Sequence, residues 1–172
     1  MIRVLGIDPG SVITGYGVIE TDGIRSFHLD HGHIRVAGDD LPEKLGFIYH
    51  QVEQLVGKWQ PDEAGVEQVF MSNNAMSALK LGQARGAAIC AMVQHGVKVS
   101  EYTPRLVKQA VVGNGAASKE QVQHMVRTLL GINTSVQADA ADALAIAICH
   151  GHSRNSLNLK KSSLLRKRSR RR

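Results

Sequence analysis

The sequence predicts an α/β domain built on a mixed sheet, partly antiparallel and partly parallel. Two features support this prediction: three apolar runs joined by short turns open the chain, and helical and strand-like segments alternate after them. The length predicts a single domain, because 172 residues fit one domain with a sizeable core better than two full domains.

The first 36 residues predict three strands. VLGI at 4–7 is a continuous apolar run that ends at Asp-Pro-Gly, as expected for a strand buried on both faces. GYGVIE follows at 15–20, and a longer run extends from Ile24 to Val36 after a Thr-Asp-Gly turn. Short strands joined by such turns favour an antiparallel meander.

Helices alternate with strands in the middle of the chain. Apolar residues at helical spacing predict a helix over 41–56, and residues 74–94 predict a second, long one. Between them AGVEQVF at 64–70 predicts a buried strand, and GVKVSEY at 96–102 predicts another. This alternation indicates that part of the sheet is parallel.

Three further helices are predicted, each with a recognisable start. Thr103 followed by Pro104 is typical of an N-cap with proline in the first turn. Ser118 with Gln121 fits a capping box. QADAADALAIAICH at 137–150 is apolar on almost every side except for two aspartates near its start, which predicts a helix in the interior.

Charge is distributed unevenly along the chain. The net charge is +6, but nine of the 21 basic residues lie from Arg154 onward, where no acid occurs, so residues 1–153 hold 12 basic groups against all 15 acids, a net charge of −3. We therefore divide the chain into a domain over 1–153 and a basic tail over 154–172, which we expect to be disordered. Such a tail suits attachment to nucleic-acid phosphates as well as a solvated run of charge.

Composition favours an intracellular protein over a membrane or secreted one. No run of eighteen or more apolar residues predicts a membrane span, and MIRVLGIDPG lacks the features of a signal peptide. Cys90 and Cys149 lie in apolar helical segments, which predicts buried free thiols in a reducing cytoplasm. We expect a cytoplasmic protein with no membrane partner.

Four acids stand where charge is costly. Asp8 closes one apolar strand, Glu67 lies inside another, and Asp139 and Asp142 stand at the start of the apolar helix. Each has a simpler explanation alone: a turn former, an outward-pointing strand residue or a helix cap. Capping explains the aspartate pair poorly, however, because side chains three residues apart share a helix face and repel.

Taken together, the four acids favour a metal site. Strand ends and helix starts can converge at one edge of an α/β sheet, and carboxylates gathered there need a cation. Mg²⁺ takes carboxylate oxygens together with water and substrate phosphate, and two such ions can hydrolyse a phosphodiester. The histidine pairs His31-Gly-His33 and His150-Gly-His152 have spacing that could hold zinc, but no cysteine accompanies them, so we favour surface or core histidines.

Five segments in this order resemble one known family. GIDPGSVITGYGVI, VEQVF, SALKLGQARG, VKQAVVGNGAASKEQV and QADAADALAIA are similar, over residues 2–151, to the RuvC family of Holliday-junction resolvases. The resemblance implies a ribonuclease H-like fold, a mixed five-stranded sheet flanked by helices. It also implies a structure-selective endonuclease, acting in recombination and DNA repair, that nicks two strands of like polarity in four-way junction DNA. A homodimer and a branch-migration motor as partner are implied as well.

The resemblance also implies roles for single residues. Mg²⁺, one or two ions per subunit with Mn²⁺ as an alternative, would be held by Asp8, Glu67, Asp139 and Asp142. Lys108 and Lys119 match basic residues of the family's active site that act in catalysis and contact DNA.

Phe70 matches a residue that stacks on junction bases, and without the resemblance it would be a core aromatic. One departure concerns the loop after Phe70, where Ser72-Asn73-Asn74 replaces a commonly basic residue, so Asn73 would have to supply the DNA contact.

Three other functions remain open at this level. The Asp-x-Gly start of DPGSVITGYG resembles the phosphate loop of actin-like ATPases and sugar kinases, although those need two such domains and a longer chain. A junction-binding protein with structural acids and a related nuclease acting on RNA are the other two.

Overall fold

A computed structural model describes the backbone of residues 1–68 and 74–169 and the side chains of 1–68 and 74–154. In these ranges the chain forms ten regular elements: β1 (Ile2–Asp8), β2 (Ile13–Thr21), β3 (Ser26–Arg35), α1 (Leu41–Trp59), β4 (Glu63–Glu67), α2 (Ala75–Gln94), β5 (Lys98–Tyr102), α3 (Pro104–Val112), α4 (Lys119–Leu130) and α5 (Ala138–Ser169).

The strands form one mixed sheet in the order β3-β2-β1-β4-β5. β1 pairs antiparallel with β2, and β2 with β3, whereas β4 runs parallel to both β1 and β5. The predicted meander and the predicted parallel half are therefore both confirmed, with the two halves meeting at β1.

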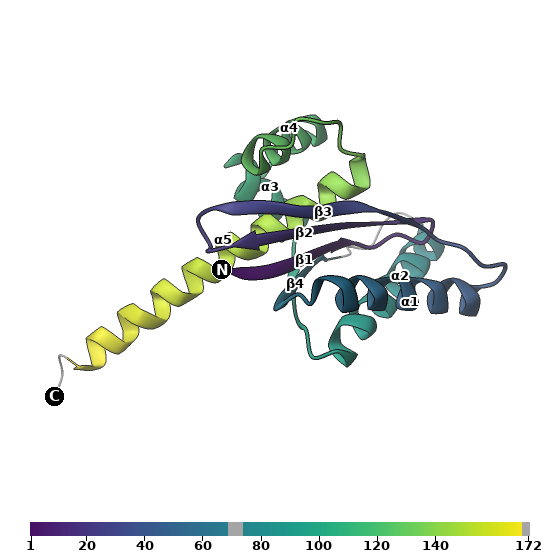
Figure 1. The fold of residues 1–172 in the computed structure, drawn as a ribbon, viewed down its shortest axis with the longest axis horizontal. Coiled ribbons are helices and arrows are strands. Elements are labelled where there is room, and N and C mark those ends of the chain that lie inside the picture. The colour runs from purple at the N-terminus through teal and green to yellow at the C-terminus, as the bar shows by residue number, and fades with distance from the viewer. Residues whose placement is uncertain (69–73, 170–172) are drawn as a thin grey trace.

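Helices cover both faces of the sheet (Figure 1), and each face has its own core. α1 and α2 pack on one face, where Leu5 and Ile7 of β1 point, whereas Val4 points to the opposite face with α3, α4 and α5. Because side chains alternate along a strand, β1 is buried on both sides. The residues at the two ends of β1 therefore have fixed positions.

A row of glycines crosses the centre of the sheet beneath α5. Gly6 of β1 pairs with Gly17 of β2 on one side and with Gly65 of β4 on the other. A Cβ added to Gly6 would lie 2.0 Å from the backbone oxygen of Ala143, and one added to Gly17 would lie 2.7 Å from the Leu144 side chain. This glycine row lets α5 approach the strands at backbone distance.

Local signals at the predicted helix starts are confirmed. The Thr103 side chain accepts a hydrogen bond from the backbone N–H of Leu106, with Pro104 in the first turn of α3. Ser118 and Gln121 form both halves of a capping box at α4. These caps satisfy backbone groups that the helices would otherwise leave unbonded.

In the C-terminal part of the chain the backbone of α5 continues to Ser169. Its later turns extend away from the rest of the fold (Figure 1). Adding a residue to an existing helix avoids the cost of nucleation, so the buried first half of α5 favours a helical conformation in its second half. The division of the chain at residue 153 stays a prediction.

Two other expectations have separate outcomes. Within the part of the chain that the structure describes, no helix is long and apolar enough to cross a membrane. Cys149 is a buried free thiol as predicted, but Cys90 is exposed, so that prediction is wrong. The reason is that α2 packs on α1 through one face only, and Cys90 lies on the other.

Candidate active site

Two of the four predicted acids lie side by side at one edge of the sheet. Asp8 is the last residue of β1 and Glu67 is the last residue of β4, one step beyond the pair Ile7–Val66 in the parallel register. Ile7 and Val66 point toward α1 and α2, so the next residue on each strand points to the face covered by α5.

The other two acids are brought to the same edge by α5. Asp8 pairs with Gly15 on β2, and a Cβ at Gly15 would lie 2.0 Å from the backbone oxygen of Asp139. The start of α5 therefore rests on the strand next to Asp8. Asp142 follows Asp139 by about one helical turn on this face, so the structure gathers all four carboxylates, which we call the carboxylate edge.

Electrostatics show that these carboxylates act on one another. Burial, followed by the charges of Glu67, Asp142 and Asp139, raises the pKa of Asp8 to about 7 against the opposing effect of Lys119. Burial followed by the Asp142 charge likewise raises the pKa of Glu67. Carboxylates that repel in this way favour a bound proton or cation.

Two lysines line the approach to the carboxylate edge. The Lys119 ammonium lies 2.8 Å from Asp142 Oδ2, and this hydrogen bond raises the pKa of Lys119. The charge of Lys108 acts on Glu67 in the opposite direction and limits the rise of its pKa. Both lysines, with Glu67 and Asp142, line a cavity of about 190 Å³. Positive charge thus lies where a phosphate would approach the acids.

The donor set at this edge fits a hard divalent cation. It offers carboxylate oxygens alone, which Mg²⁺ and Mn²⁺ prefer, and mutual repulsion leaves the acids in need of positive charge. As the side chains stand, no three acids, histidines or cysteines in the described ranges are grouped closely enough to hold one ion. Asp142 is engaged by Lys119 instead, so ion binding would require side chains to reorient.

Arg85 of α2 supports this edge and was not predicted. Its Nε donates to the backbone oxygen of Glu67 at 3.0 Å, and its guanidinium lies 2.8 Å from Glu101 Oε1 on β5. The side chain is 18% exposed. Arg85 therefore ties α2 to the last residue of β4 and to β5, and fixes the backbone that carries the Glu67 carboxylate.

The predicted DNA-stacking residue cannot be placed. Phe70, Ser72 and Asn73 lie outside the described residues, so their roles stay predictions. Asn74 caps α2, where its side chain accepts a hydrogen bond from the backbone N–H of Ser77. The sequence alone showed no sign of this capping role.

Two histidines of the Gly-spaced pairs form side-chain hydrogen bonds. His150 is buried and bonds to Glu63 and Tyr102 at the opposite end of the sheet. His31 bonds to His28. No zinc-like group of three ligands occurs among the residues described.

Comparisons with known proteins agree with this geometry. The family model described as crossover junction endodeoxyribonuclease RuvC matches residues 4–150. A protein of that name from Hahella chejuensis is 57% identical over 157 residues, covering 91% of each chain. One from Yersinia enterocolitica is 56% identical over 171 residues, covering 99% of each chain.

Solved structures show the same similarity in three dimensions. Thermus thermophilus RuvC in complex with a Holliday junction substrate superposes with a TM-score of 0.83 at 34% identity, covering 89% of this chain and 94% of that one. The yeast mitochondrial Holliday junction resolvase shares only the fold, with a TM-score of 0.68 at 13% identity and coverage of 94% and 84%. The expected mixed five-stranded sheet is confirmed.

Proposed function

The chain belongs to the RuvC family of crossover junction endodeoxyribonucleases, and on that premise we propose that the carboxylate edge is the active site at which it resolves Holliday junctions. The protein is an endonuclease of recombination and repair that hydrolyses DNA at four-way junctions. The observation that carries the site assignment is the mutual repulsion of four carboxylates brought to one edge from three different elements.

Asp8, Glu67, Asp139 and Asp142 hold the divalent cation in this proposal. We assign Mg²⁺, one or two ions per subunit, with Mn²⁺ as an alternative. When bound, the cation activates the attacking water and stabilises the leaving oxygen. The rigid strand ends place Asp8 and Glu67, whereas the close contact of α5 with Gly15 places Asp139.

Lys108 and Lys119 bind the phosphate of the strand to be cut. Lys119 is held at the edge by Asp142, and both lysines line the cavity that Glu67 and Asp142 also line. Their charge favours the developing negative charge on the phosphate over the ground state. The products would be 5′-phosphate and 3′-hydroxyl ends, with Phe70 stacking on bases to open the crossover.

A homodimer would place two such sites on one junction. The outward face of α2 supports this arrangement, because Met76, Leu79 and Val93 are more than half exposed and a Cβ at Gly82 or Gly86 would meet no atom within 4 Å. A second copy packed on this face would bury these apolar groups. Two-fold symmetry then directs paired nicks to two strands of like polarity.

Cleavage of a synthetic four-way junction tests the proposal. We expect paired nicks in opposed strands when Mg²⁺ or Mn²⁺ is present and no nicks without a divalent cation. Linear duplex of the same sequence and an RNA junction should not be cut. Tight binding without cutting would instead favour a junction-binding protein, and cutting of RNA would favour a ribonuclease. We expect the activity in the bacterial cytoplasm, with a branch-migration motor as partner.

A further inference from the structure

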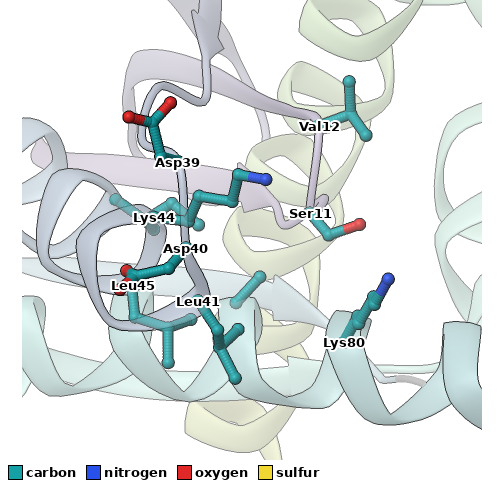
Figure 2. Close-up of a pocket in the computed structure, with 10 residues that line it drawn as sticks. Ser11, Val12, Asp39, Asp40, Leu41, Lys44, Leu45 and Lys80 are labelled. Carbon is teal, nitrogen blue, oxygen red and sulfur yellow. The ribbon is translucent and has the colours of Figure 1, made fainter.

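A second cavity lies on the other face of the sheet from Lys108 and Lys119. It measures about 290 Å³ and is formed by the loop between β1 and β2, the start of α1 and one side of α2. Ser11 and Lys44 line it from the first two segments and Lys80 from the third. We call it the Lys44–Lys80 pocket (Figure 2).

The chain itself ties this pocket to the carboxylate edge. Ser11 follows Asp8 by three residues, and three residues span at most about 10–11 Å. Along the axis of a DNA duplex this distance corresponds to the rise of roughly three nucleotides of one strand. The pocket therefore lies within reach of the same DNA strand that passes the carboxylates, on the side away from α3 and α4.

Donor groups gather on the side of the pocket that faces α2 and the Ser11–Val12 loop. In Figure 2 the Lys44 side chain extends toward the Ser11–Val12 loop, and the Lys80 ammonium points from α2 toward the Ser11 hydroxyl. Neither lysine has an acid within 4.0 Å in the ranges that the structure describes. Two ammonium groups and a hydroxyl therefore converge without a carboxylate between them.

Asp39 and Asp40 also line the pocket, but among the described residues neither forms an ion pair with Lys44 or Lys80. Asp40 caps α1, where its Oδ1 accepts a hydrogen bond from the backbone N–H of Glu43 at 2.9 Å. Its carboxylate and that of Asp39 lie beyond Lys44, on the side away from Lys80 (Figure 2). Within residues 1–68 and 74–154, no carboxylate occupies the space between the two ammonium groups, which leaves that space open to an acceptor from a ligand.

We propose that Ser11, Lys44 and Lys80 bind backbone phosphates of the DNA strand that crosses the carboxylate edge, an inference that rests on the proposed function. Phosphate oxygens accept from ammonium and hydroxyl groups and carry the negative charge that pairs with the two lysines. The strand is then held on both sides of the acids, by Lys108 and Lys119 on one face and by Lys44 and Lys80 on the other.

The salt dependence of junction binding tests this inference. Binding of the full-length protein to a four-way junction is measured without divalent cation, so that no complex is lost to cleavage, over a series of salt concentrations. Each phosphate contact contributes ~0.9 to the slope of log affinity against log salt. Lys44→Ala and Lys80→Ala should each lower that slope by ~0.9, and the double variant by ~1.8. Between 50 and 200 mM salt the deficit of the double variant relative to the unchanged protein should then shrink by about 12-fold.

Two variants serve as controls. Lys98→Ala removes an exposed ammonium at the opposite end of the sheet and should leave the slope unchanged. The pair Lys44→Arg and Lys80→Arg keeps both charges and should keep the slope. Thermal unfolding of every variant establishes that losses do not reflect misfolding.

The outcomes separate this inference from the proposed function. A folded double alanine variant with an unchanged slope, or an arginine pair that loses it, overturns the phosphate contacts while junction cleavage by the unchanged protein still stands. Inorganic phosphate alone is the second probe: if it raises the melting temperature of the unchanged protein but not of the double variant, and the DNA slopes agree, the pocket serves free phosphate and the DNA assignment is wrong. Failure of the unchanged protein to cut junctions overturns the proposed function itself.

Discussion

Strand β4 carries a glutamate at each end, and the fold surrounds the two differently. At one end, burial followed by the charge of Asp142 raises the pKa of Glu67. For Glu63 at the other end burial also acts to raise the pKa, but hydrogen bonds from His150 and Arg154 outweigh burial and lower it. This strand of five residues therefore has a repelling carboxylate at one end and, at the other, a carboxylate that is paired by hydrogen bonds.

The end at Glu63 is a closed network. His150 Nε2 lies 2.7 Å from Glu63 Oε2, and Arg154 Nε donates to Glu63 Oε1 at 3.0 Å. Because a carboxylate only accepts, Nε2 carries the proton, and Nδ1 of the neutral ring accepts from the Tyr102 hydroxyl at 2.9 Å. Burial lowers the pKa of His150, in keeping with a neutral ring. The hydrogen bonds at this end connect α5 to the sheet, whereas the carboxylates at the other end have negative charge that a cation can neutralise.

The largest effect should follow from removing a carboxylate at the open end. Asp8→Asn keeps the shape of the side chain but removes a negative charge on which cation binding depends. We expect the cleavage rate to fall by ~10²–10³-fold or more, while junction binding without metal persists. Glu120→Gln, an exposed acid in the first turn of α4, is the control. Cutting by Asp8→Asn at the unchanged rate would contradict the metal-site assignment.

The next largest effect tests how α5 joins the two ends. Gly15→Ala places a methyl group 2.0 Å from the Asp139 backbone oxygen, so strand or helix must move. We expect a loss of ~1–3 kcal/mol in the free energy of unfolding and slower cleavage, because the start of α5 shifts. Gly46→Ala on α1, where a Cβ meets nothing within 4 Å, should instead gain ~0.5–1 kcal/mol. Equal effects of the two substitutions on denaturant unfolding would argue against the close contact.

A smaller effect is expected at Arg85, which acts on Glu67 only through the backbone. Arg85→Ala should reduce cleavage by ~10–100-fold and raise the Mg²⁺ concentration needed for half-maximal rate. A purely structural loss would lower the melting temperature without changing that Mg²⁺ requirement. Glu101→Gln weakens the charge pair but spares the hydrogen bond to Glu67, so it should have the milder phenotype.

The last effect concerns how stability, not cleavage, depends on pH in metal-free buffer. The pKa of Asp8 is raised from 3.8 to about 7, so the folded state binds the extra proton and stability falls as pH rises across that window. Glu63 and His150 have lowered pKa values, so their contribution is lost as pH falls, below 6.5 for His150 and below 4.5 for Glu63.

Melting temperatures between pH 4 and 8 separate the two ends. Asp8→Asn should flatten the fall in stability toward neutral pH, and Glu63→Gln should flatten the loss at acidic pH. Each kcal/mol corresponds to ~2–4 °C for a chain of this size. If melting temperature changed with pH in the same way for both variants, the two ends of β4 would not differ in their effect on the pH dependence of stability.

Sequence was sufficient where the cause is local. Thr103 and Ser118 cap helices through backbone groups two or three residues away, so the residue types alone predicted them. Asp8 and Glu67 were conspicuous because apolar strands surround them. Their meeting at one edge depends on strand order, which is set by packing between segments far apart in the chain.

Other features have no sequence signal. Arg85 bonds to a backbone oxygen, which every residue possesses, and to an acid on a separate strand. The pairing of Lys119 with Asp142 and of His150 with Glu63 likewise joins distant segments. The continuation of α5 beyond Arg154 follows from the helix that already precedes it, which charge patterning along the sequence does not register.

Gly6 of the glycine row and Gly15 beside Asp8 also limit how this chain can diverge. A methyl group at Gly6 or Gly15 would meet backbone oxygens of α5, not side chains. No replacement on the helix can therefore make room, since even glycine keeps its carbonyl. Compensating pairs of mutations, the usual route by which cores drift, are closed at these two positions. Any lineage that changes one of them must move the whole helix, and the start of α5 carries two of the acids with it.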